Sequence, residues 1–388
     1  MQNADGPPVD RRYGGAMTRA GATEVDLDVV LADLRTLVEV ESPSLDLEAL
    51  GRSATAVAGL IERRLGTPAE LVASAAGPHV HWRGGGAPRV LVVGHHDTVF
   101  PLGTLASRPF SVADGHVLGP GVFDMKGGIV LAIHAVAALE DRTGVELLWT
   151  ADEEVGSGAS RALIEERAQA CGAVLVLEPA GEGRAIKIGR KGTGCFEVVV
   201  YGRAAHAGLE PEKGVNALVE AAHQVLAIAQ LGRPEHGTTV TPTVASAGTA
   251  DNVVPAEARV RVDMRVTNLG EGARVEAAMA ALRAVDDDAQ LDVRGGMNRP
   301  PMETSSAAEL YEVLTKVAAD VGIDLPPAIS VGGGSDGNFT AALGIPTLDG
   351  LGVTGGGAHA DHEFAEISTM PERTNLLSAL INRLCHRP

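Results

Sequence analysis

At 388 residues, the chain is long enough to form one large domain or two medium-sized ones around a substantial core. Its formal net charge of −18 argues against a nucleic-acid partner, because phosphate backbones require a basic surface. Three scattered cysteines are too few for a disulfide framework or a cysteine-based zinc site, and without a run of about 18 apolar residues we expect no membrane-spanning helix.

Residues 1–22 are polar and rich in glycine and proline. They lack the apolar segment of a signal peptide, so we expect a disordered lead-in and a cytoplasmic protein, with Met17 as an alternative start. Apolar periodicity then predicts a series of helices and buried strands. The helices cover residues 27–40, 54–65, 126–139 and 160–170, and the strands cover 90–93, 145–149 and 174–177. This alternation is typical of an α/β sheet with helices on both faces.

The pattern changes near Gly192. Strands are predicted at 196–201, 238–245, 258–266 and 291–293, and helices at 215–229 and 272–285. Their β-α-β-β-α-β order predicts a ferredoxin-like α+β module. We therefore expect a catalytic domain in two parts, residues 23–191 and 303–388, with the module inserted as residues 192–302. Helices at 307–321 and 373–384 and a strand at 345–348 return to the first pattern.

Polar residues follow the strand at 90–93 and open the next helix. With strand alternation, His95 and Asp97 point the same way and His96 points the opposite way. His95 can bind zinc through one nitrogen while Asp97 supports its other N–H, although a capped strand end with a solvated Asp97 explains the pattern equally well. Asp124, at the start of the next helix, could bridge two metal ions with its two oxygens, but taken alone it is better explained as an N-cap.

Three consecutive acids, Asp152, Glu153 and Glu154, follow the strand at 145–149. Such acids repel one another in a low-dielectric site, and a nearby cation explains them better than a solvated loop. One of two adjacent carboxylates can bind metal while the other carries a proton.

Two further candidates stand at Glu178 and His359. Glu178 ends the strand at 174–177, where a solvated strand end is the simple alternative, and His359 follows a run of three glycines that permits close backbone approach. Together the five segments supply two histidines and three carboxylates as candidate ligands. Mixed nitrogen and oxygen ligation of this kind suits two zinc ions that share a carboxylate, with Co²⁺ or Mn²⁺ as alternatives.

From about Leu27 to Leu384 the chain resembles the dinuclear zinc carboxypeptidase/aminoacylase family, nearest to its glutamate carboxypeptidase branch, the carboxypeptidase G type. The resemblance implies a zinc-exopeptidase-like catalytic domain, an inserted lid and dimerisation domain, and a homodimer. It also implies the roles of the site residues. One zinc takes His95 and Glu178, the other takes Glu154 and His359, Asp124 bridges them, Asp97 orients His95, and Glu153 is the general base.

The resemblance extends to substrate residues in and beyond the inserted module. It implies that His206 reaches the active site of the partner subunit, that Asn252 faces the substrate, and that Arg265 binds the substrate carboxylate. Arg299 resembles a second carboxylate-binding arginine, and Gly334 lies in a glycine-rich substrate loop, residues 332–336.

The implied activity is hydrolysis of an amide or peptide bond beside a free carboxylate, in a small peptide or N-acyl amino acid. Release of a C-terminal amino acid, with glutamate as a candidate, is the leading interpretation. Alternatives are an N-acyl amino acid deacylase, similar to an acetylornithine deacetylase, or a dipeptidase. A non-catalytic binding protein is disfavoured by Glu153, because binding needs no general base.

Overall fold

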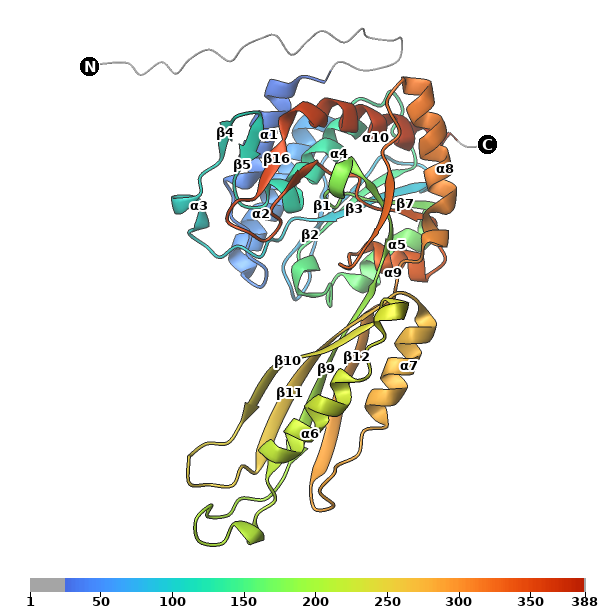
Figure 1. Ribbon diagram of the computed structural model, residues 1–388. Coiled ribbons are helices and arrows are strands. Elements are labelled where there is room, and N and C mark those ends of the chain that lie inside the picture. The colour runs from blue at the N-terminus through green and yellow to red at the C-terminus, as the bar shows by residue number, and fades with distance from the viewer. Residues whose placement is uncertain (1–24, 387–388) are drawn as a thin grey trace, which may run out of the picture.

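A six-stranded sheet forms the centre of the larger part of the molecule (Figure 1). The computed structural model describes residues 25–386, so the expected lead-in at 1–22 lies outside the described residues. Strand β3 pairs in parallel with β6 and β7. The strands, in spatial order, are β1 (Glu70–Val72), β2 (His79–Arg83), β6 (Val145–Thr150), β3 (Val90–His95), β7 (Ala173–Val176) and β14 (Thr347–Leu348).

Helices cover both faces of this sheet, as the sequence predicts. Alternate residues of β3 enter two separate apolar clusters, because successive side chains of a strand point to opposite faces. One face packs against α1 (Leu27–Val38), α2 (Leu47–Leu65), α4 (Gly127–Ala137), α8 (Thr304–Val321) and α10 (Met370–Cys385). The other face packs against α5 (Arg161–Ala170) and α9 (Gly337–Ala342).

Several elements differ from the predicted ones. Helix α2 begins seven residues earlier than the predicted residue 54, because Asp46 caps it by accepting the main-chain N–H of Ala49 at 2.9 Å. Short strands also escaped the prediction, since two to five residues give little periodicity. The ones outside the central sheet are β4 (Ser111–Ala113), β5 (His116–Leu118), β8 (Ile186–Arg190), β13 (Ala328–Val331), β15 (Gly355–Gly356) and β16 (Phe364–Glu366).

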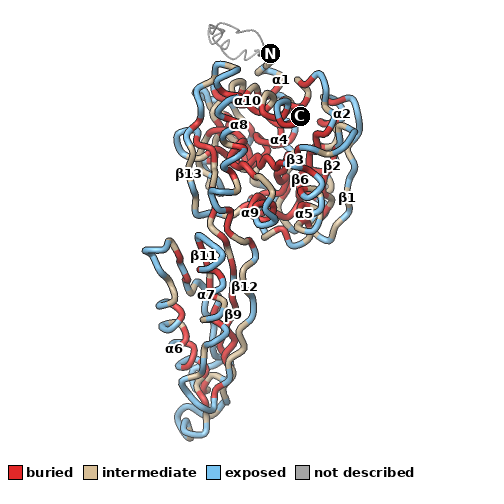
Figure 2. Tube along the Cα trace, turned by 90° about the vertical axis from the view of Figure 1, so that its right-hand side faces the viewer, coloured by how far each residue is buried: buried red, intermediate tan, exposed pale blue. Residues whose placement is uncertain are grey.

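A second, elongated module projects from the sheet-centred part (Figures 1 and 2). It has its own apolar core and a four-stranded sheet in the order β10-β11-β9-β12, as a ferredoxin-like fold requires. Its elements are β9 (Gly192–Tyr201), α6 (Ala217–Ala229), β10 (Thr239–Ala247), β11 (Glu257–Val266), α7 (Leu269–Ala280) and β12 (Gln290–Arg299). Residues 192 and 302 remain our proposed boundaries for this inserted module, which we refer to as the lid. Within residues 25–386, no helix is both long and apolar enough to cross a membrane.

Candidate metal centre

His95 and Asp97 lie together at the carboxyl end of β3. The Nδ1 atom of His95 is 3.0 Å from the main-chain oxygen of Asp97 and 3.4 Å from its Oδ1. Asp97 also accepts hydrogen bonds from Ser44 Oγ (2.7 Å) and from the main-chain N–H groups of Glu153 (3.2 Å) and Glu154 (3.3 Å). Asp97 therefore fixes both the imidazole of His95 and the turn that carries the two glutamates.

His96 points away from this group, as alternation predicts. Its ring nitrogens lie 3.2 Å from Ser53 Oγ and 3.0 Å from the main-chain oxygen of Pro78. Burial lowers the pKa of His96 to about 4, so the ring stays neutral at physiological pH. His96 is a core histidine in this structure.

Asp124 does not cap α4. It lies in a short π-helical turn, η1 (Val122–Lys126), and its φ and ψ of −117° and 96° are not helical. Helix α4 starts with a glycine pair that lets it approach the end of β7. A Cβ on Gly128 would lie only 2.2 Å from the carbonyl oxygen of Leu177, so this close approach requires glycine. The approach brings Asp124 beside Glu178, the residue after Leu177.

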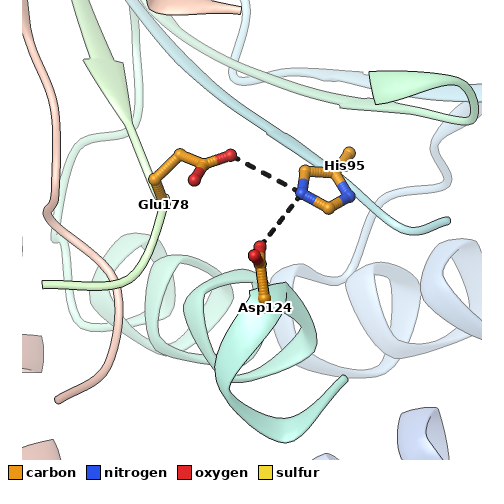
Figure 3. Close-up of side chains that lie close together, drawn as sticks. All are labelled: His95, Asp124 and Glu178. Carbon is orange, nitrogen blue, oxygen red and sulfur yellow. Dashed lines mark ion pairs between the residues drawn. The ribbon is translucent and has the colours of Figure 1, made fainter. Parts of the chain in front are cut away.

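Two groups of possible metal ligands share Asp124. In the first group, His95 Nε2 lies 3.3 Å from Asp124 Oδ1 and 3.6 Å from Glu178 Oε1 (Figure 3). In the second group, His359 Nε2 lies 3.4 Å from Asp124 Oδ2 and 3.1 Å from Glu154 Oε2. Within each group the ligand atoms lie within 4.8 Å of one another. The two oxygens of Asp124 therefore face two separate positions, the arrangement of a bridging carboxylate.

The electrostatics of these groups fit divalent cations. His95 Nε2, Asp124 Oδ1 and Glu154 Oε1 are buried and have no hydrogen-bond partner among residues 25–386. Burial alone would lower the pKa of His95, but the carboxylates of Asp124, Asp97 and Glu178 raise it well above its usual value. Asp124 and Glu154 likewise raise the pKa of His359 to about 10. These carboxylates attract positive charge strongly, and a metal ion would satisfy the unpaired atoms better than protons do.

Glu153 directly precedes the candidate ligand Glu154 and is 8% exposed. Burial raises its pKa well above the usual value, although the charge of Arg299 opposes this shift. Arg299 Nη2 lies 2.9 Å from Glu153 Oε1 and also donates to Ser157 Oγ at 2.7 Å. A carboxyl that is shielded from solvent and has a raised pKa is a candidate for proton transfer.

The structure does not bring His206 and Asn252 to these groups within one chain. Strand β9 leads away from the central sheet, and both residues lie in loops at the distal end of the lid, in the connections β9–α6 and β10–β11 (Figure 1). There the main-chain N–H of Ala207 donates to the main-chain oxygen of Asn252 at 2.9 Å.

Arg265 and Gly334 lie near the proximal end of the lid. Arg265 pairs across the sheet with Thr193 and forms an ion pair with Asp263 at 2.9 Å. A Cβ on Gly334 would lie 3.0 Å from the side chain of Thr193 and 3.2 Å from that of Arg299.

Three residues with contacts at this site received no role from the sequence. Glu363 accepts hydrogen bonds from the main-chain N–H groups of the loop that carries Asp124. Arg190 and Asp349 form a buried ion pair at 2.6 Å next to Glu178. Only the position of Glu363, four residues after His359, offered a local signal, because the other contacts join segments that are far apart in the chain.

A comparison with known protein families covers the five candidate metal ligands. A model of peptidase family M20/M25/M40 matches residues 91–383, which include all five candidate metal ligands. The chain belongs to this family. Enzymes of the M20 family are metal-dependent, and this chain is accordingly an M20 hydrolase, a metallopeptidase or amidohydrolase.

Similar M20 proteins differ in their activities. The chain is 33% identical to carboxypeptidase G2 of Pseudomonas sp. over 315 residues, 77% of this chain and 74% of that one. It is 31% identical to a succinyl-diaminopimelate desuccinylase of Xanthomonas oryzae pv. oryzae, covering 78% and 85%.

Two solved structures share the fold. The aminopeptidase PepT of Bacillus cereus has a TM-score of 0.74 at 22% identity, covering 93% of this chain and 99% of that one. A metallo-carboxypeptidase of Sulfolobus solfataricus has a TM-score of 0.73 at 17% identity, covering 94% and 100%.

Proposed function

We propose that this M20 protein uses two metal ions to hydrolyse an amide bond beside a free carboxylate and releases a C-terminal amino acid, with glutamate as the leading candidate. The observation that carries the proposal is the position of Asp124. Its two oxygens face two ligand groups. Glu153 directly precedes Glu154, a member of the second group, and the charges of Glu178 and His95 in the first group act on it. Similarity to carboxypeptidase G2 supports the carboxypeptidase assignment.

The donor set supports zinc as the metal. Each group combines one imidazole nitrogen with carboxylate oxygens, which suits Zn²⁺, while Co²⁺ and Mn²⁺ remain compatible with the same donors. His95 and Glu178 would hold one ion, Glu154 and His359 the other, and Asp124 both. When bound, the two ions supply Lewis acidity that polarises an amide carbonyl and makes a water molecule more acidic.

The chain's own residues would perform the remaining tasks. Glu153 would accept a proton from the attacking water and deliver it to the leaving nitrogen. Asp97 would hold the ring of His95 in one orientation, as carboxylates hydrogen-bonded to metal-binding histidines do. Arg265 would bind the substrate carboxylate with its planar fork once its pairing with Asp263 opens, and the loop with Gly334 would line the substrate site.

A second copy of the chain completes the proposed site. His206 and Asn252 lie at the distal end of the lid, whereas the ligand groups lie at the central sheet. We infer that a homodimer brings these two residues of one subunit to the ligand groups of the other. His206 would then donate to the developing oxyanion, and Asn252 would contact the substrate. The cytoplasmic location remains a prediction.

A second candidate function is deacylation of an N-acyl amino acid. Similarity to a succinyl-diaminopimelate desuccinylase favours it, and that protein covers a similar share of this chain. A dipeptidase is a further form of the same alternative. These activities would use the same metal ligands and Glu153, and would differ in the residues that contact the substrate.

One experiment separates these activities. Purified protein would be analysed for metal and assayed on an N-acyl-glutamate amide, acetyl and succinyl amino acids, and dipeptides. About two zinc ions per chain, with glutamate release that a chelator abolishes, would support the carboxypeptidase. Turnover of acyl amino acids alone would select the deacylase. Absence of both metal and turnover after zinc addition would overturn the proposal.

A further inference from the structure

Arg190 stands at the junction between the catalytic sheet and the lid. It is the last residue of β8 and lies two residues before β9, the strand that enters the lid. Its main chain exchanges hydrogen bonds with Met302, at 2.9 and 3.0 Å, where the chain returns from the lid. Arg190 is only 5% exposed. A buried cation requires hydrogen-bonding or charged partners, and the partners of Arg190 show which segments it connects.

The guanidinium of Arg190 contacts three different parts of the site. Its Nε and Nη2 atoms donate to the two oxygens of Asp349 at 2.6 and 3.0 Å. Nη2 also donates to Glu178 Oε2 at 3.3 Å, and Nη1 donates to the carbonyl oxygens of Gly333 and Gly334 at 3.0 and 3.2 Å. One side chain therefore joins a candidate metal ligand to the glycine-rich loop. All three of its nitrogens have protein acceptors, so we assign Arg190 no contact with substrate.

The two carboxylate oxygens of Glu178 face two different residues. Its Oε2 faces Arg190, and its Oε1 faces His95 Nε2 at 3.6 Å, on the side of the first ligand group (Figure 3). The contact with Arg190 fixes the rotamer of Glu178 and leaves Oε1 free for a cation. This is the geometry by which outer residues orient a ligating carboxylate.

Because Arg190 also pairs with Asp349, it contacts only one carboxylate oxygen of Glu178. Asp349 is fully buried, and its bidentate contact with Arg190 is shorter than the contact between Arg190 and Glu178. Ser335 Oγ donates to Asp349 Oδ2 at 2.6 Å, which ties the residue after Gly334 to the same carboxylate. Burial alone would lower the pKa of Arg190, but the charges of Asp349 and Glu178 raise it above its usual value. One arginine balances one of these two carboxylates, so negative charge remains for a cation.

We propose that Arg190 is a positioning residue that couples the metal position at Glu178 to the shape of the glycine-rich loop, residues 332–336. This inference rests on the proposed function, because it takes Glu178 as a metal ligand. Loss of the guanidinium frees Glu178 to rotate and the loop to move. The same change therefore weakens both metal binding and substrate binding, since the two depend on one side chain.

The test compares Arg190→Lys with Arg167→Lys in the full chain. Arg167 is a matched control, because it forms a similar bidentate ion pair with buried Glu146, at 2.8 and 2.5 Å, on a part of β6 that carries no candidate ligand. Measurements are the affinity of each metal position by chelator competition, the absorption spectrum of the Co²⁺-loaded protein, and KM and kcat. Melting of the metal-free proteins reports any general loss of stability.

We expect Arg190→Lys to bind one of the two metal ions about 10- to 100-fold more weakly, the usual effect of losing an outer-shell contact. Its Co²⁺ spectrum should change, and its KM should rise roughly tenfold, by the same loss of positioning. Arg167→Lys should lose stability alone. A second variant, Asp349→Asn, should also weaken metal binding. Without the charge of Asp349, Arg190 can form hydrogen bonds with both oxygens of Glu178.

The outcomes separate this inference from the proposed function. Wild-type metal affinities, Co²⁺ spectrum and KM in Arg190→Lys, or in Asp349→Asn if the first variant does not fold, would overturn the positioning role and leave the proposed function intact. A wild-type protein that binds no divalent cation would overturn both.

Discussion

Glu363 holds Asp124 in place through the main chain. The Oε1 atom of Glu363 accepts the N–H of Asp124 at 2.9 Å and that of Phe123 at 3.0 Å, and its Oε2 accepts the N–H of Gly121 at 2.8 Å. Glu363 is 1% exposed and lies four residues after His359. One short segment therefore supplies a candidate ligand and clamps the loop that presents the bridging carboxylate.

Replacing Glu363 by alanine should release that clamp. We expect Glu363→Ala to bind metal about 10- to 100-fold more weakly, because the loop no longer holds Asp124 in one geometry. Chelator competition measures this affinity directly. Glu366→Ala is the control, since Glu366 takes part in this region through its main-chain N–H, which donates to Thr354 at 2.8 Å. Unchanged metal affinity in Glu363→Ala would show that the clamp is dispensable.

Replacement by alanine should have different effects on metal content and kcat at Glu153 and at Glu154. Glu153→Ala should keep its metal and lose roughly 100-fold or more in kcat, the usual scale for a general base. Glu154→Ala should instead lose metal, because its Oε2 lies 3.1 Å from His359 Nε2 in the second ligand group. Elemental analysis and kcat distinguish the two results. Near-normal turnover in Glu153→Ala, or full zinc occupancy in Glu154→Ala, would reverse the assigned roles.

Mixing two inactive variants tests whether sites are built from two subunits. Glu153→Ala and His206→Ala should each be inactive alone. In a mixed dimer, however, one site combines the intact Glu153 of one subunit with the intact His206 of the other. Unfolding and refolding an equal mixture should therefore restore about a quarter of wild-type activity, since half of the dimers carry one intact site of two. Activity that stays at the level of the separate variants would argue for sites within single chains.

A buried carboxylate that belongs to neither ligand group gives a prediction for stability against pH. Asp33 accepts hydrogen bonds from Arg64 at 2.6 and 3.0 Å and lies 2.8 Å from His134 Nε2. Burial alone would raise the pKa of Asp33, but His134 and Arg64 lower it below its usual value of 3.8. The stability from this carboxylate is therefore fully present above pH 3.8 and is lost as the pH falls through the lower pKa of the folded state.

Asp33→Asn should accordingly reduce the free energy of unfolding by roughly 3 kcal/mol at neutral pH, the scale for breaking a buried ion pair. The difference from wild type should shrink as the pH falls below about 4. Urea unfolding at several pH values measures it. The exposed pair of Glu48 and Arg52 provides a control, and Glu48→Gln should change stability by less than about 0.5 kcal/mol. A difference that is constant with pH would contradict the electrostatic explanation.

The sequence by itself determined the local features of this protein. Periodicity located the main strands and helices, because apolar spacing follows directly from the 2-residue and 3.6-residue repeats. Strand alternation placed His95 with Asp97 and turned His96 away, and the structure has this arrangement. The sequence also predicted that His95 and Glu178 lie close together, since polar residues at the carboxyl ends of parallel strands meet at one edge of a sheet.

Only the tertiary structure decided how these residues combine. From the sequence, Asp124 was either an N-cap or a bridge, and the packing of α4 against the end of β7 placed it between two ligand groups. The contacts between Glu363 and Asp124 and between Arg190 and Asp349 join residues 239 and 159 positions apart. No local pattern encodes such contacts, because strand order and helix packing set the distances between remote segments. The same holds for His206, because its distance from the ligand groups depends on how the whole module is oriented.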